Sequence, residues 1–219
     1  MIELSKAGEL FTLTMNNEAN TICLDWQDRM LAALDQMEMA HGQGTALVIT
    51  GQGKYFSNGV NLDAMSALDT RGVERFARRM LDIHRRLIAL PFPTVAAING
   101  HAFAGGAFLA LSTDYRIMRE DRGWFCISEV DAGVPIPAPM MDILHAKLPP
   151  ATVRDATLTG KRYTAGEAIS ASIVDQQVAA DALSDAASDL ATTLASKEFG
   201  ILKNIKQTLY RHLTSRLVE

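Results

Sequence analysis

Cysteine is scarce in this sequence, and acidic and basic residues nearly balance. The chain has 219 residues but only two cysteines, Cys23 and Cys126, which lie far apart and form no CxxC pair. Their apolar neighbours are typical of buried, reduced thiols, which argues against a disulfide scaffold and favours a reducing compartment. The formal net charge is −4, so the chain lacks the basic footprint of proteins that bind nucleic acid. We expect a cytoplasmic protein with no nucleic-acid partner.

Long apolar runs are missing as well. No stretch approaches the roughly 20 apolar residues that a membrane-spanning helix needs. The first residues, MIELSKAGELF, lack the basic start and apolar run of a signal peptide, and the final residues, SRLVE, are not a peroxisomal address of the Ser-Lys-Leu kind. We therefore expect no membrane partner.

Several well-known catalytic motifs are also absent. The sequence contains no G-x-S-x-G elbow, Walker A loop, H-E-x-x-H, G-x-G-x-x-G or Cys/His cluster with metal spacing. Its five histidines are scattered singly, and a lone histidine is usually structural or solvated. His101 stands out among them because its segment is rich in glycine. We expect neither a metal nor a bound cofactor.

The hydrophobic pattern predicts alternating strands and helices, and so an α/β fold. The expected elements are a hairpin over 2–5 and 10–15, helices over 25–39, 71–90 and 105–113, and strands over 46–50, 94–98 and 115–118. Strands separated by helices favour a parallel sheet with right-handed crossovers. After Pro149 the pattern is almost wholly helical, with helices expected over 151–159, 165–170, 182–196 and 199–213. We predict a core over 1–150 and a C-terminal helical region over 151–219.

Two glycine-containing loops follow predicted buried strands. The first runs from Phe56 to Leu62 and the second from Asn99 to Gly106. Open α/β sheets bind ligands at the carboxyl ends of their strands. Backbone N–H groups from two such loops can converge on one oxygen as an oxyanion hole. Composition alone favours the plainer interpretation, in which both loops are ordinary tight turns between strands and helices.

Three segments resemble elements of the crotonase (enoyl-CoA hydratase/isomerase) superfamily. Residues 55–62, YFSNGVNL, resemble its F-S-x-G-x-D-L element, and residues 95–106, VAAINGHAFAGG, are similar to its A-x-x-G-x-A-x-G-G element. Residues 109–118, LALSTDYRIM, are similar to the run that follows. The order and spacing of the segments also match, and the resemblance covers roughly residues 1 to 213.

This resemblance implies a crotonase-like ββα spiral core with a C-terminal helical region, and an acyl-CoA thioester as substrate. Carried over by motif, the oxyanion hole consists of the N–H groups of Val60 and Gly105. The implied substrate-binding residues are Ser57, Asn58, Gly59, Asn61, Leu62, Gly106, Phe108 and Pro135. CoA would be part of the substrate, so no separate cofactor is implied. The family also implies a homotrimer or a dimer of trimers.

The reaction depends on the acid or base that meets the substrate. Hydratases of the family resemble one another in having two glutamates, and here the first of these positions is Phe108 while the second is Glu129. An apolar residue followed by a glutamate is similar to the Δ3,Δ2-enoyl-CoA isomerases of the family. Glu129 would then move a proton between two substrate carbons, and apolar surroundings should raise its pKa.

Several features depart from the family pattern. Asn61 replaces an aspartate, and residues 134–139, VPIPAP, replace a glycine-rich turn, so the acyl pocket should differ in shape from that of a hydratase. The chain also stops where longer relatives continue with further helices. Lys203 and Lys206 on the last predicted helix could meet CoA phosphates or could form a solvated basic face.

Other functions remain open from the sequence. One is a hydratase or another crotonase-type lyase or hydrolase that uses Glu129 with Asp131 or His101 as a helper. Another is a non-catalytic acyl-CoA-binding protein. Glu129 could also be a surface carboxylate at a strand end or helix cap.

Overall fold

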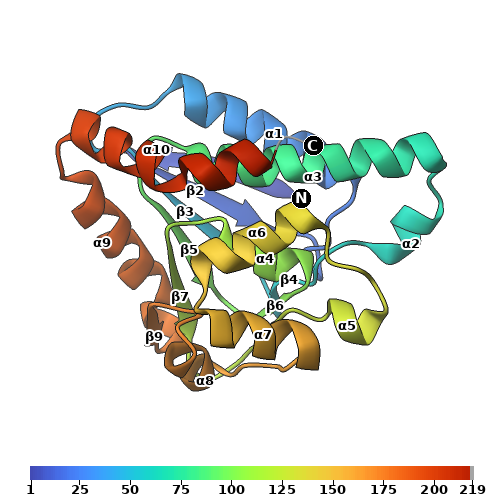
Figure 1. Ribbon diagram of the computed structural model, residues 1–219. Helices are drawn as coiled ribbons and strands as arrows, with labels where there is room; N and C mark the ends of the chain where they lie inside the picture. The colour runs from blue at the N-terminus through green and yellow to red at the C-terminus, as the bar shows by residue number, and fades with distance from the viewer. Residues whose placement is uncertain (218–219) are drawn as a thin grey trace.

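Two sheets form the centre of the molecule (Figure 1). The computed structural model describes residues 1–217. The large sheet has the strand order β1 (Ile2–Ala7), β2 (Leu10–Met15), β3 (Ala46–Gly51), β5 (Thr94–Ile98), β7 (Tyr115–Arg119) and β9 (Gln176–Val178). The β1–β2 pair is antiparallel and every other neighbouring pair is parallel. The small sheet is parallel and consists of β4 (Tyr55–Ser57), β6 (His101–Phe103) and β8 (Phe125–Cys126).

Helices connect and cover these strands. They are α1 (Leu24–Met39), α2 (Leu62–Ser66), α3 (Thr70–Ala89), α4 (Gly105–Leu111), α5 (Glu129–Ala132), α6 (Ala138–Lys147), α7 (Pro150–Thr159), α8 (Ala165–Ser170), α9 (Leu183–Ala195) and α10 (Phe199–Arg216). The N-terminal hairpin, the predicted helices and the three predicted parallel strands are confirmed to within about three residues. Among residues 1–217, no helix combines the length and apolar character needed to cross a membrane.

The central strands of the large sheet, β3, β5 and β7, are buried on both faces, as their apolar sequences predict. Successive side chains of a strand point to opposite faces, so Leu47 and Ile49 pack with α1 and α3, whereas Val48 packs with α9. Helix α9 presents an alanine at every fourth position to this second face, at Ala187, Ala191 and Ala195. Small side chains at that spacing allow the helix to lie close to the sheet.

The long helix α3 follows its predicted pattern. Asp69 caps it by accepting a hydrogen bond from the Gly72 N–H at 2.7 Å, and the helix stops at Ala89, shortly before Pro91. A proline disfavours helical backbone in the residue before it, which explains this end. Phe76 is buried on the inner face, whereas Val73 is 41% exposed. The first turn of α3, which carries Val73, therefore lies outside the core, at the edge of the cavity described below.

The small sheet was not predicted. Its strands have two or three residues each, too few to produce a recognisable hydrophobic period, and the sequence pattern assigned two of them to loops. After β3 and after β5 the chain makes a short turn. The residues beyond the two turns then pair with each other as β4 and β6. Gly100 permits the second turn, since a Cβ at this position would collide with the carbonyl of Lys54. The two predicted glycine loops emerge from this small sheet.

The C-terminal region is part of the same core. The prediction of an almost wholly helical region was wrong at β9, which pairs with β7 at the edge of the large sheet. Two of the three β9 residues are exposed and polar, so no apolar pattern marks the strand. Figure 1 shows α10 running beside α3, and buried Leu213 joins the main core cluster. The predicted region ends with residues 218 and 219, which lie outside the described residues.

Candidate active site

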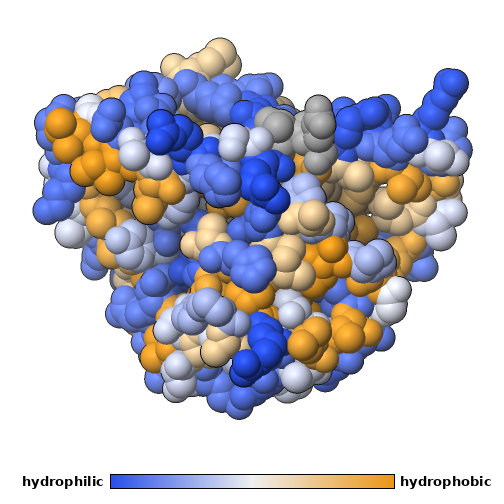
Figure 2. All heavy atoms as spheres, in the orientation of Figure 1, coloured by the Kyte–Doolittle hydropathy of each residue, from blue (hydrophilic) through white to orange (hydrophobic). Residues whose placement is uncertain are grey.

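An apolar cavity of about 430 Å³ opens between α2, α3, α4 and the chain from α5 to α6. We call it the main cavity. Figure 2 shows apolar side chains gathered on the face of the molecule between α3 and α5. Six residues predicted from the sequence line it: Val60, Leu62, Gly105, Phe108, Glu129 and Pro135. Of all the residues that line the main cavity, Glu129 is the one with an ionisable side chain.

The first predicted loop presents the N–H of Val60. Gly59 turns the chain with a φ of +79°, and its carbonyl accepts a hydrogen bond from the Ile22 N–H at 2.8 Å. The Asn61 N–H donates to the Ile22 carbonyl at 2.9 Å, which completes a parallel bridge between Ile22 and Val60. Val60 lies between the two residues that bond to Ile22, so its own N–H and carbonyl groups point away from Ile22. The Val60 N–H accordingly donates to none of residues 1–217.

The second predicted loop presents the N–H of Gly105. This residue opens α4, and the first N–H groups of a helix have no intrahelical acceptor. Ala104, just before it, has a φ of +47° and a ψ of −120°. A non-glycine residue in such a sparsely populated conformation costs on the order of 1–3 kcal/mol, and strain of this kind clusters at functional sites. The strained Ala104 sets the direction in which the Gly105 N–H points.

The two loops touch. A Cβ placed on Gly59 would lie 3.1 Å from the Gly105 nitrogen, and a Cβ placed on Gly105 would lie 3.6 Å from a methyl carbon of Val60. Two N–H groups without a partner in the described part of the chain therefore lie on adjacent loops at the wall of one cavity. This arrangement can hold one oxygen that carries developing negative charge.

Glu129 is the first residue of the short helix α5, and two residues separate it from the end of β8. Its Oε2 atom is buried and has no hydrogen-bond partner among the described residues. Burial raises the pKa of this carboxyl above its ordinary value, because an unpaired charge is poorly solvated there. A carboxylate with a raised pKa and no competing partner is suited to accept and return a proton.

Phe108 lies one turn after Gly105 on α4 and is 2% exposed. Phe108 lines the main cavity, so this part of the wall presents an apolar surface. A phenyl ring can neither donate nor accept a proton. General acid–base chemistry in the main cavity therefore depends on Glu129.

The other predicted substrate-binding residues do not line the main cavity. The Ser57 hydroxyl donates to the Asn20 carbonyl at 2.7 Å and accepts from the Gly59 N–H at 3.2 Å. The Asn61 side chain caps α2 by accepting from the Ala64 N–H at 2.9 Å. Gly106 packs against the backbone of Ser57, and Asn58 is exposed. Together with Gly59, these residues hold the shape of the first loop.

Much of the wall of the main cavity was missed in the sequence analysis. Six missed residues come from α2 and α3: Met65, Val73, Phe76, Ala77, Met80 and Leu81. Met140 of α6 was missed as well, whereas Val134, Ile136 and Pro137 belong to segment 134–139, which was expected to change the shape of the pocket. The apolar spacing of α3 was the available signal, but it indicated contact with the core and could not distinguish a core from a cavity wall.

Two expectations about basic and helper residues need revision. Lys206 is neither on a solvated face nor free to meet a phosphate, because its ammonium group is buried and donates to Asp114 at 2.6 Å and to the Phe92 carbonyl at 2.8 Å. His101 lies among three aromatic rings at the small sheet, and Asp131 is exposed. Neither of these two suggested helpers lines the main cavity. Within residues 1–217, no three His, Cys, Asp or Glu side chains are grouped as metal ligands.

Comparison with known proteins gives a consistent result. The family model described as enoyl-CoA hydratase/isomerase matches residues 6–219. The chain is 34% identical to enoyl-CoA delta isomerase 3 of Arabidopsis thaliana, covering 97% of this chain and 93% of the relative. It is 33% identical to a putative enoyl-CoA hydratase of Thermus thermophilus, covering 80% of this chain and 70% of the relative.

Solved structures show the same fold. An enoyl-CoA hydratase/isomerase family protein from Pseudomonas syringae superposes with a TM-score of 0.92 at 27% identity, covering 99% of this chain and 93% of that one. A probable enoyl-CoA hydratase from Mycobacterium tuberculosis gives a TM-score of 0.91 at 23% identity, with 99% and 91% coverage. The chain has the crotonase fold and belongs to the enoyl-CoA hydratase/isomerase family, whose enzymes act on acyl-CoA thioesters.

Proposed function

We propose that this protein is a Δ3,Δ2-enoyl-CoA isomerase. The N–H groups of Val60 and Gly105 hold the thioester oxygen of a 3-enoyl-CoA. The Glu129 carboxylate removes a proton from the second carbon, and the electron pair delocalises into a dienolate whose negative charge rests on that oxygen. Glu129 then returns the proton to the fourth carbon, so that the double bond moves from the 3- to the 2-position.

The observation that carries this proposal is the single carboxylate of the main cavity. Moving a proton between two carbons of one substrate needs one group that is first a base and then an acid. Adding water needs a second group to activate the water, and Phe108 stands at the corresponding place. The chemistry uses no group beyond the substrate and the chain, and so requires neither metal nor separate cofactor. The oxyanion hole supplies several kcal/mol, since losing one donor typically costs about 3–4 kcal/mol.

The named relatives give partial support. Relatives called enoyl-CoA delta isomerases from Arabidopsis thaliana cover nearly the whole chain. A relative called a putative enoyl-CoA hydratase and others called carnitinyl-CoA dehydratases are about equally identical over shorter or comparable stretches. Hydration of a 2-enoyl-CoA is therefore the second candidate.

The purified protein should be assayed with matched 3-enoyl-CoA and 2-enoyl-CoA substrates. We expect conversion of the 3-enoyl to the 2-enoyl thioester and no 3-hydroxyacyl product. In Glu129→Gln, turnover should fall by at least a thousandfold while acyl-CoA binding is kept. Asp131→Asn is the matched control, because Asp131 belongs to the same helix and does not line the main cavity.

Three results would contradict the proposal. Water addition without isomerisation identifies a hydratase. Loss of activity in Asp131→Asn indicates that a second carboxylate takes part. Acyl-CoA binding without turnover of either substrate, unchanged by Glu129→Gln, indicates a non-catalytic binding protein.

Assembly and location belong to the same proposal. We infer a homotrimer or a dimer of trimers in the cytoplasm. Helix α10 exposes three apolar side chains four residues apart, at Ile201, Ile205 and Leu209, which fits a covered surface in an oligomer. Figure 2 shows apolar side chains over the first turns of this helix. Both cysteines are free thiols, as a reducing compartment would keep them.

A further inference from the structure

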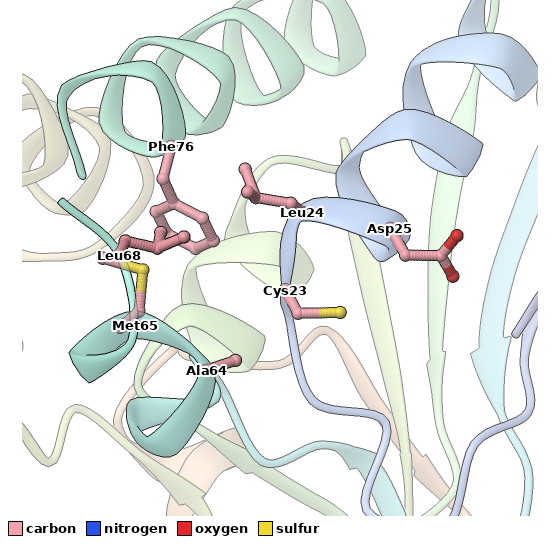
Figure 3. Close-up of a pocket in the computed structure, with 7 residues that line it drawn as sticks. All are labelled: Cys23, Leu24, Asp25, Ala64, Met65, Leu68 and Phe76. Carbon is pink, nitrogen blue, oxygen red and sulfur yellow. The ribbon is translucent and has the colours of Figure 1, made fainter. Parts of the chain in front are cut away.

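A second apolar cavity of about 240 Å³ lies beside the main cavity (Figure 3). We call it the side cavity. Residues 23–25, where the chain enters α1, form one wall, and Ala64, Met65, Leu68 and Phe76 form the other. Met65 and Phe76 also line the main cavity. These two side chains therefore form the partition between the two cavities.

The side cavity suits hydrocarbon. Its lining is apolar except at Asp25, whose side chain is 71% exposed and pairs with Arg29 at 2.9 Å. Figure 3 shows the Asp25 carboxylate directed away from Met65 and Phe76. The charged group thus lies at the rim, and the interior presents carbon and sulfur. A charged or strongly polar ligand group would lose its hydration there without gaining a partner.

Phe76 is a buried residue of the long helix α3, whereas Met65, the other half of the partition, lies on a lightly held segment. Met65 belongs to α2, a helix of five residues none of which is buried. The helix is held to the first loop by the Asn61 cap and by the hydrogen bond from the Met65 N–H to the Asn61 carbonyl at 3.0 Å. A methionine side chain is unbranched and flexible, and adapts to different neighbours. Segments with few buried contacts open at low free-energy cost.

We propose that the side cavity receives the far end of the acyl chain, and that Met65 and Phe76 set the chain lengths accepted. This inference rests on the proposed function, because it places the thioester at Val60 and Gly105 in the main cavity. A chain that passes Glu129 and fills the main cavity reaches the partition next. The favoured substrates are then unbranched acyl-CoA thioesters long enough to displace Met65, and the accepted chain has no fixed upper length because the side cavity opens at Asp25.

Binding of saturated acyl-CoAs tests the inference separately from catalysis, because these thioesters have no double bond to move. Dissociation constants should be measured by calorimetry from butanoyl-CoA to hexadecanoyl-CoA. Each buried methylene contributes about 0.8 kcal/mol, which is about a fourfold decrease in Kd. We expect this decrease to continue past the chain length that fills the main cavity and to level off once the chain reaches solvent.

Two variants change the side cavity in opposite directions. Ala64→Phe fills it without touching the main cavity, and should weaken binding of the long chains at least tenfold relative to butanoyl-CoA. Met65→Ala removes part of the partition and should leave the long chains bound at least as tightly relative to butanoyl-CoA as in the unmodified protein. Ala67→Phe is the matched control, because Ala67 is exposed on the same segment and lines neither cavity. Leu24→Trp fills the side cavity from the opposite wall if Ala64→Phe does not fold.

The outcomes separate the inference from the proposed function. A chain-length profile that is the same in Ala64→Phe, Leu24→Trp and Ala67→Phe overturns the inference. Equal weakening of every chain and of free CoA in Ala64→Phe also overturns it, because the CoA arm would then occupy the side cavity. Selective loss of long chains supports the inference even if no isomerase activity is found. Isomerase activity with an unchanged profile leaves the proposed function and removes only the inference.

Discussion

At the scale of single residues, the side chain of Glu129 is held in an unfavourable state that suits its proposed chemistry. Its buried Oε2 atom has no partner among residues 1–217, and the neighbouring wall is apolar. In solution water would solvate the charge, whereas here the carboxylate is ready to take a proton. The burial that raises the pKa of this carboxyl favours activity, because the carboxylate takes up a proton readily. It lowers stability at high pH, because the ionised carboxylate is poorly solvated in the folded protein.

The activity should depend on pH through this carboxyl. Burial raises the pKa of Glu129 above its ordinary value of 4.5, and the ionised form is the base that starts the reaction. We expect kcat/KM for a 3-enoyl-CoA to fall on acidification with a midpoint above 4.5. Steady-state rates over a series of buffers measure this midpoint, with circular dichroism at each pH to verify that the protein stays folded. A midpoint at or below the ordinary value would contradict the assignment of Glu129.

The stability should respond in the opposite way. A carboxyl whose pKa is raised by folding binds its proton more tightly in the folded state. Its contribution to stability is therefore present below the unfolded pKa and is lost as the pH rises through the folded pKa. At about pH 8 the charge destabilises the fold, so Glu129→Gln should have a higher Tm than the unmodified protein.

Thermal unfolding at about pH 8 and about pH 4 measures this difference. Each kcal/mol corresponds to roughly 2–4 °C for a chain of this size, and the advantage of Glu129→Gln should shrink at the lower pH. An advantage that grows on acidification would show that the sign is wrong.

At the scale of elements, α2 forms a lightly held wall between two cavities. It has no buried residue, and its first turn depends on the Asn61 cap. Asparagine stands here in place of the family's aspartate and still accepts the hydrogen bond from Ala64. The substitution therefore keeps the cap without placing a negative charge at the start of α2.

Loss of this cap should loosen α2 without unfolding the molecule. Asn61→Ala removes the acceptor, which typically costs about 1 kcal/mol. We expect faster amide hydrogen exchange within residues 62–66, little change in exchange of α4, and a Tm within a few degrees of the unmodified protein. Asn61→Asp is the control, because a carboxylate can accept the same hydrogen bond. Equal exchange in Asn61→Ala and the unmodified protein would mean that the cap does not hold the helix.

At the scale of the whole molecule, a buried ion pair joins the C-terminal helix to the large sheet. The Lys206 and Asp114 side chains are 7% and 12% exposed and lie 2.6 Å apart. Asp114 also accepts hydrogen bonds from the backbone N–H and hydroxyl of Thr94, at 2.9 and 3.0 Å. The pair thus links α10 to the starts of β5 and β7.

Removing one partner of this pair should be strongly destabilising, since it leaves the other charge buried. Lys206→Met should lower the free energy of unfolding by about 3–5 kcal/mol, measured by urea denaturation. Asp114→Asn combined with Lys206→Met should cost less than the sum of the two single changes, because neither charge of the pair is then left buried without the other. Lys203→Met on the same helix is the control and should change stability by about 0.5 kcal/mol or less. Additive single changes would show that the pair is not coupled.

The proposed oligomer can be tested on the same helix. Ile201, Ile205 and Leu209 are 58–68% exposed in a single chain, a stripe that another subunit would cover. Ile205→Lys should lower the oligomer mass measured by size-exclusion chromatography with light scattering. Gln207→Lys, at an exposed position on the opposite face of the helix, is the control. A monomeric mass for the unmodified protein would refute the trimer.

The sequence by itself determined the hairpin, the long strands, the long helices and the glycine loops. These elements are long enough for hydrophobic period and turn chemistry to act locally, as in α3, or carry a recognisable motif, as at Gly105 and Gly106. The glycine loops and Glu129 were found because motifs of the family are continuous in sequence. Val60, Gly105, Phe108 and Glu129 do line one cavity.

Only the tertiary structure decided the small sheet, strand β9, the wall that α2 and α3 give to the main cavity, and the partner of Lys206. The small sheet and β9 have too few apolar positions to show a period, and they form because other strands offer them hydrogen bonds. An apolar side chain such as Phe76 obeys the same spacing whether it faces a core or a cavity. A lysine on a helix is normally solvated, and Lys206 is buried because Asp114, distant in sequence, meets it there.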